Sequence, residues 1–149
     1  MPKTKTPLTP EERLRLAKRY LRNAKEVLKK SPVDKEAGIY EDIKYVSEAS
    51  GTAYISALEA LKALFMFKKG WDVEKVKEET KEVGSYRKIL KTLPIGKDKD
   101  VLIKLFSSVY DILHLGGYYR ELQDKKAIDS GFEKVEKIIQ IVEKHIKQG

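Results

Sequence analysis

Apolar residues recur at three- and four-residue steps through most of the chain, and this periodicity constrains the fold more than any other feature of the sequence. The first periodic segment follows residues 9–12, Thr-Pro-Glu-Glu, a capping box with a hydroxyl at the N-cap and proline at the first helical position. Its apolar stripe comprises Leu14, Ala17, Leu21, Ala24 and Leu28. Because side chains at this spacing share one face of an α-helix, we expect a helix that ends near Lys30, before the Ser31-Pro32 pair.

Four further helices are expected from the same periodicity and from caps and breakers. They cover about residues 40–69, 73–92, 98–122 and 128–147. Asp72 is the expected N-cap of the third of these five helices, Gly70 the C-cap of the second, and Gly84-Ser85 a break within the third. No segment alternates with a period of two, so we expect no sheet. Short loops place successive helices antiparallel, which predicts an all-α, up-and-down bundle of four to five helices.

The second expected helix carries a run of small residues around Gly51. A glycine inside a helix costs about 1 kcal/mol relative to alanine, and the close approach of another helix would offset that cost. We therefore expect this helix to be the most buried and Gly51 to lie at a helix contact.

Length and composition restrict the class of protein. The chain has 149 residues, the usual size of one domain, and we assign residues 9–149 to it after a disordered basic segment at residues 1–8. Cysteine is absent, which excludes disulfides, thiolate metal sites and a cysteine nucleophile, and fits a reducing compartment. No apolar run approaches the roughly 18 residues that a membrane span needs, and the N-terminus lacks the apolar core of a secretory signal. These features predict a cytoplasmic protein without a membrane partner.

The net charge leaves two interpretations open. Lys and Arg number 31 against 23 Asp and Glu, a formal charge of +8. This excess favours an anionic partner such as RNA, DNA or a nucleotide. Charged residues make up 36% of the chain, however, and a surface rich in both lysine and glutamate is also typical of thermophile proteins. Because acids and bases are interleaved rather than clustered, the second interpretation is favoured.

Histidine occurs twice, and only His114 has a neighbourhood that suggests a site. His145 lies near the end of the last expected helix, where we expect it at the surface because no partner group lies nearby in sequence. Residues four apart share a helix face, so Tyr110, His114 and Tyr118 should line up, and Asp111 could accept the imidazole N–H. The candidate binding residues are therefore Tyr110, Asp111, His114, Tyr118, Tyr119 and Arg120. The more ordinary alternative is a core histidine, hydrogen bonded for stability among packed aromatic rings.

No motif in the sequence is sufficient by itself for catalysis or metal binding. One candidate histidine, no cysteine and scattered carboxylates do not form a ligand set, and Gly116-Gly117 fits no phosphate-binding glycine pattern. A serine nucleophile would need an elbow and an oxyanion turn, which are missing. We expect neither a metal nor a cofactor, and His114 is the one candidate catalytic residue.

Three stretches together resemble the HEPN superfamily of small helical bundles. They are Tyr20 to Leu28, Ala53 to Ala60 and Tyr110 to Tyr119, and the likeness extends over roughly residues 14–123. The resemblance implies a four- or five-helix bundle that pairs as a homodimer. Many members are ribonucleases or belong to toxin–antitoxin and nucleotidyltransferase-associated systems.

Ribonuclease members of that superfamily place an arginine a few residues from a histidine in a dimer cleft. If His114 is that histidine, the arginine should fall at residues 107–109, which are Ser, Ser and Val. The expected function is therefore a non-catalytic binding or regulatory module, a homodimer that associates with a nucleotide, RNA or protein partner. The alternative is a metal-independent ribonuclease that uses His114 with a cation from another helix or subunit.

Overall fold

The structure, a computed structural model, describes residues 6–148 and is mostly helical. Within these residues lie six α-helices, one π-helix and two short strands. The helices are α1 (Pro10–Leu28), α2 (Ile43–Lys69), α3 (Val73–Glu79), α4 (Val83–Thr92), α5 (Asp98–Val109), η1 (Tyr110–Tyr119) and α6 (Lys125–Gln148). The strands are β1 (Val33–Asp34) and β2 (Ile39–Tyr40). Of the N-terminal segment expected to be disordered, residues 1–5 lie outside this described range.

Helices α1 and α2 begin and end close to where the sequence predicted. The Thr9 hydroxyl accepts a hydrogen bond from the Glu12 amide at 3.0 Å, the contact that defines the capping box. The Asp42 carboxylate caps α2, and Gly70 ends it with a left-handed φ of 67°. Glycine reaches that conformation without the steric cost that a Cβ would impose. Local chemistry therefore fixes both boundaries.

The third expected helix is two helices, and the predicted position of its break was wrong. The chain leaves the helix after Glu79, whereas Gly84 lies in the first turn of α4. Thr80 is buried, and its hydroxyl donates to the Val76 carbonyl at 2.6 Å. The same carbonyl also accepts the Thr80 amide at 3.1 Å, and a hydroxyl that bonds back to the preceding turn weakly destabilises a helix and often bends it, in keeping with a break here.

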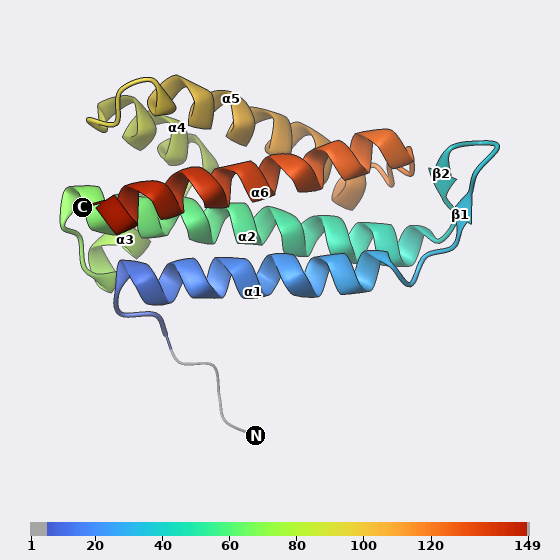
Figure 1. Ribbon diagram of the computed structural model, residues 1–149, viewed down its shortest axis with the longest axis horizontal. Coiled ribbons are helices and arrows are strands. Elements are labelled where there is room, and N and C mark those ends of the chain that lie inside the picture. The colour runs from blue at the N-terminus through green and yellow to red at the C-terminus, as the bar shows by residue number, and fades with distance from the viewer. Residues whose placement is uncertain (1–5, 149) are drawn as a thin grey trace.

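The expectation of no sheet was also wrong. Strands β1 and β2 form an antiparallel pair in which Val33 opposes Tyr40 and Asp34 opposes Ile39. Two residues per strand are too few to produce an alternating pattern in the sequence. The hairpin also ties α1 to the loop before α6, since the Tyr40 amide donates to the Gln123 carbonyl at 2.9 Å. Figure 1 shows this hairpin at one end of the bundle.

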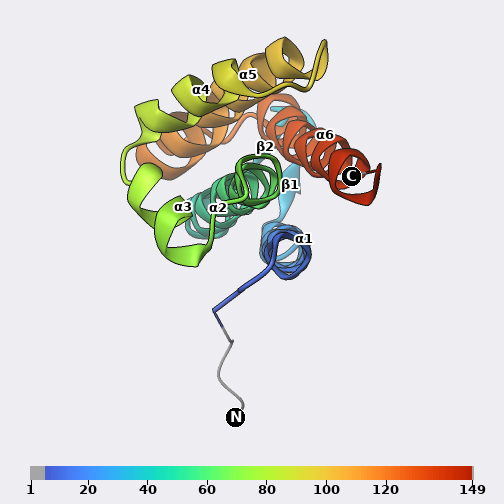
Figure 2. The same ribbon diagram turned by 90° about the vertical axis from the view of Figure 1, so that its left-hand side faces the viewer.

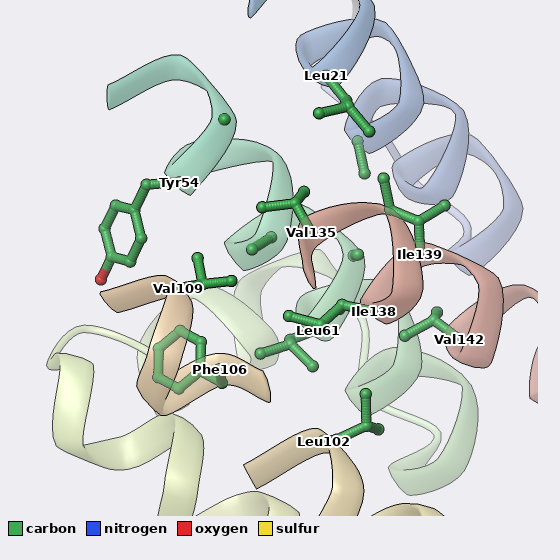
Figure 3. Close-up of a cluster of buried hydrophobic side chains, with 14 of the residues drawn as sticks. Leu21, Tyr54, Leu61, Leu102, Phe106, Val109, Val135, Ile138, Ile139 and Val142 are labelled. Atoms are coloured by element: carbon green, nitrogen blue, oxygen red, sulfur yellow. The ribbon is translucent and has the colours of Figure 1, made fainter. Parts of the chain in front are cut away.

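Helix α2 is the central element, with α1, α6 and the α4–α5 pair around it (Figures 1 and 2). Small residues on α2 allow a close approach of α1, and the buried Ser56 hydroxyl donates to the Ala17 carbonyl of α1 at 2.6 Å. On its other sides α2 meets the apolar stripes of α5 and α6 (Figure 3). The fully buried residues at this junction include Leu61, Leu102, Phe106, Val109 and Ile138. The prediction that α2 is the most buried helix is thus consistent with its fourteen buried positions.

Within residues 6–148, no helix has both the length and the apolar character that crossing a lipid bilayer requires.

Candidate binding site around His114

The segment from Tyr110 to Tyr119 is a π-helix that continues directly from α5, so the single α-helix expected over residues 98–122 was wrong. At its end the Arg120 amide donates to the Leu115 carbonyl, five residues earlier, at 3.0 Å. A π-helix has a wider turn than an α-helix, and such segments occur frequently at functional sites. The wider turn changes which side chains face each other along this part of the chain.

Two glycine contacts allow η1 to lie against α2. A Cβ built on Gly117 would lie 2.1 Å from the Ser50 hydroxyl oxygen, a distance that only glycine accommodates. A Cβ on Gly51 would lie 3.0 Å from the Tyr118 ring. The close approach expected at Gly51 therefore exists, and an aromatic ring of η1 makes it.

The site is a cluster of aromatic rings around the His114 imidazole. The imidazole stacks on Tyr54 with ring centroids 4.5 Å apart, and lies nearly parallel to Tyr118 at 6.2 Å. Tyr110 and Tyr119 each lie 5.1 Å from it. The structure thus brings together Tyr110, His114 and Tyr118, as their spacing predicted, and the π-helical turn brings Tyr119 to the same imidazole. We refer to these five residues as the His114 cluster.

Sequence reasoning missed Tyr54, the ring closest to His114. Tyr54 belongs to α2, sixty residues earlier in the chain, and it reaches η1 because α2 and η1 pack together. Its only sequence signal was an aromatic residue set among small ones. Such a residue on an apolar helix face ordinarily indicates core packing, and Tyr54 does retain only 6% of its exposure.

Two predicted site residues lie apart from the imidazole. Asp111 is exposed, and no hydrogen bond among the described residues joins it to His114. Arg120 is also exposed, and its backbone amide, rather than its guanidinium, makes the contacts that end η1. Neither residue therefore contributes to the ring cluster itself.

A cavity of about 390 Å³ opens beside the cluster, between α2 and η1. Its lining consists of Glu48, Gly51, Thr52, Tyr54, Ile55, His114 and Tyr118. Tyr118 is 48% exposed to solvent and Ile55 is 41% exposed, so the cavity mouth is apolar and accessible. Of the described residues that line it, only Glu48 carries a charge.

Burial controls the protonation of the cluster. Loss of solvation lowers the pKa of His114 below its ordinary value, so the imidazole is neutral at pH 7. Burial, with a smaller contribution from Tyr110, raises the pKa of Tyr54 to about 12. The Tyr54 hydroxyl is therefore protonated, and it is buried with no hydrogen-bond partner among the described residues. The rings that line the cavity are therefore uncharged at pH 7, which suits stacking on a planar ligand group.

One guanidinium lies at the edge of the His114 cluster. Arg87 of α4 donates from Nε to the Ser107 hydroxyl at 3.1 Å. Its Cζ lies 5.7 Å from the centre of the Tyr110 ring and 5.5 Å from that of Phe106. The tertiary fold thus places a cation beside η1 that the sequence around His114 lacks.

The other histidine has a structural contact that the sequence did not predict. His145 Nε2 lies 2.7 Å from Asp98 Oδ2, and its side chain is only 15% exposed, so the prediction of an exposed surface histidine was wrong. Hydrogen bonds from Lys144 and then from His145 lower the pKa of Asp98. This contact joins the start of α5 to the end of α6. No group of three or more potential metal ligands occurs among the residues that the structure describes.

Comparisons with known proteins place the chain in a family. A family model described as a domain of unknown function, DUF5618, matches residues 12–144. A solved structure of a protein of unknown function from Dyadobacter fermentans is 35% identical to the chain. The match covers 93% of this chain and 99% of that one, with a TM-score of 0.69. A search of the curated proteins found no match. The range matched by the family model includes the whole His114 cluster.

Proposed function

This chain belongs to the DUF5618 family, and we propose that it is a non-catalytic, HEPN-like binding module whose cavity beside His114 receives the base of a nucleotide or of single-stranded RNA. The observation that carries the proposal is the run of stacked rings from buried Tyr54 through His114 to exposed Tyr118. Aromatic faces of this kind stack on nucleobases with little dependence on sequence. The cavity volume of about 390 Å³ lies within the usual range of small-molecule sites.

The charge of the lining indicates which part of a nucleotide would enter. Glu48 can accept a hydrogen bond from the exocyclic amino group of adenine, cytosine or guanine, which uracil lacks. The same carboxylate repels phosphate, so the phosphates would remain outside the cavity, in solvent. The neutral imidazole of His114 adds a flat face and a hydrogen-bonding nitrogen without a charge that must be desolvated.

Two further observations support the HEPN-like part of the proposal and its non-catalytic part. The three stretches of the chain that resemble that superfamily lie in α1, α2 and η1, and α2 packs against both of the others. The absence of a basic residue at positions 107–109 supports a binding role rather than catalysis. A regulatory role, as in toxin–antitoxin-type systems, is part of the same proposal.

The test is a titration of fluorescently labelled single-stranded oligoadenylate and oligouridylate, measured by anisotropy at low salt. Loss of a stacking ring costs about 1–3 kcal/mol per base, so Tyr118→Ser should weaken oligoadenylate binding roughly 5- to 150-fold. Tyr20→Ser, on α1 and distant from the cavity, is the matched control and should bind as the wild type does. Glu48→Gln should reduce the preference for oligoadenylate over oligouridylate. Binding that Tyr118→Ser leaves unchanged would refute the proposal.

Ribonuclease activity is a second candidate, and Arg87 is the observation that favours it. A cation from α4 beside Tyr110 could approach a phosphate near the neutral His114, which can act as a base. Incubation of mixed RNA with the wild type in the presence of a chelator would detect such cleavage. Cleavage that His114→Ala and Arg87→Ala both abolish would establish the enzyme and replace the non-catalytic proposal.

A further inference from the structure

Helices α1 and α6 both pack on α2 (Figure 2). The side chains of these two helices line a groove between them. It consists of two neighbouring cavities of about 570 and 320 Å³, and Lys25 and Glu136 line both of them. Its apolar floor is formed by Leu21, Leu28, Phe132 and Ile139. None of these residues belongs to the His114 cluster or to the cavity beside it.

The two walls of this groove carry opposite charges. The α1 wall is basic and consists of Lys18, Arg22, Lys25 and Lys29. The α6 wall is acidic and consists of Asp129, Glu133, Glu136 and Glu143. The exception, Lys125, is paired with Asp129 at 2.6 Å. This separation contrasts with the chain as a whole, in which acids and bases are interleaved.

Only part of this charge is neutralised within the chain. Lys18 pairs with Glu143, and Lys25 pairs with Glu136 at 3.4 Å, so two ion pairs bridge the walls. Among the described residues, no ion pair involves Arg22, Lys29 or Glu133, all of which are exposed. Unpaired charges therefore remain on both walls.

We propose that a second copy of this chain docks on the α1–α6 face, with the basic α1 wall of each copy on the acidic α6 wall of the other. A two-fold axis parallel to the groove exchanges the positions of the walls, so every contact joins opposite charges. The α1 and α6 helices run antiparallel in the chain (Figure 1), and the same axis makes each facing pair antiparallel as well. A two-fold axis across the groove would instead place like walls together, so the charge pattern selects one orientation.

The size of this face suits a dimer. Helix α1 has 19 residues and α6 has 24, so they extend about 28 and 36 Å at 1.5 Å per residue. Two such helices side by side, with their flanking side chains, provide a footprint of the order of the roughly 800 Å² per partner that a standard interface buries. The sequence had suggested a dimer seam at the His114 face, whereas the α1–α6 face leaves the cavity there open to a ligand.

The test uses two double variants, each designed so that two copies of the same variant repel one another. Arg22→Glu/Lys29→Glu makes the unpaired charges of the α1 wall negative, and Glu133→Lys/Gln140→Lys makes those of the α6 wall positive. All four side chains are exposed, and none takes part in the bridging ion pairs, so both variants should retain the wild-type circular dichroism spectrum. Sedimentation at low salt should show a wild-type dimer, and each variant should dissociate with a constant raised roughly tenfold or more.

An equimolar mixture of the two variants provides the decisive measurement. In the first variant the unpaired charges of both walls are negative, and in the second they are positive. In the proposed dimer opposite charges therefore meet at both contacts, so the mixture should form a heterodimer that native mass spectrometry resolves by mass. A wild-type chain that is monomeric at high micromolar concentration would overturn the proposal and leave the groove to a helix of another protein. A dimer that persists in both variants but is lost in Tyr118→Ser would also overturn it, in favour of the His114 face.

Discussion

Replacing Gly117 with alanine should destabilise the protein, because the π-helix η1 lies against Ser50 of α2 with no room for a side chain. The new Cβ would lie 2.1 Å from the Ser50 oxygen and 2.6 Å from its Cβ. Ordinary contacts of this kind exceed 3 Å, so the helices would have to separate by about 1 Å. Overpacking of this type costs about 1–3 kcal/mol, and the alanine recovers up to about 1 kcal/mol of helix propensity. We expect a net loss of about 1–2 kcal/mol in the free energy of unfolding.

The Ser50→Gly background shows whether this contact is responsible. It removes both Ser50 atoms, so the methyl group introduced by Gly117→Ala would then meet only the flexible end of Ile128 at 3.2 Å. In urea titrations followed by circular dichroism, Gly117→Ala should be neutral or stabilising by up to about 1 kcal/mol in that background, a coupling of about 2 kcal/mol. Gly84→Ala, where no atom lies within 4 Å of the added Cβ, is the matched control and should be neutral or stabilising. An equal cost of Gly117→Ala in both backgrounds would refute the packing of η1 on α2.

Three further predictions concern polar side chains that are buried or partly buried, and urea titration tests each of them. The buried Arg13 guanidinium lies 2.6 Å from the Glu59 carboxylate, so Glu59→Met leaves a buried charge without its partner and should lower the free energy of unfolding by about 3–5 kcal/mol. Arg13→Met/Glu59→Met should recover most of that loss. Similar losses in the single and double variants would contradict this. Burial lowers the pKa of His114 below 6.5, so the unfolded chain binds a proton at this imidazole more readily than the folded chain does. The free energy of unfolding should therefore be highest above pH 6.5 and fall as the pH drops through the folded-state pKa. His114→Phe should lose that part of the pH dependence, and equal slopes in both proteins would refute it. Tyr54→Phe removes a buried hydroxyl without a partner and should be neutral or stabilising by up to about 1 kcal/mol, whereas a clear loss would reveal a bound partner at that oxygen.

Features that depend on neighbours in the sequence were predictable. The N-cap at Thr9, the left-handed C-cap at Gly70 and the apolar stripe of α1 each arise within one or two helical turns. The grouping of Tyr110 with His114 was predictable for the same reason, since residues four apart remain close in an α- or a π-helix. The hairpin of β1 and β2 was missed because each strand has only two residues, too few to show an alternation of apolar and polar residues.

The sequence by itself determined a helical chain with these caps, its apolar faces and a histidine among tyrosines. Only the tertiary structure decided the π-helical turn, the stack of Tyr54 on His114 and the contact of His145 with Asp98. Those features join residues far apart in the chain, and they depend on how closely two helix surfaces fit. At Gly117 the fit depends on the lack of a Cβ, and the spacing of apolar residues along the chain gives no sign of that requirement.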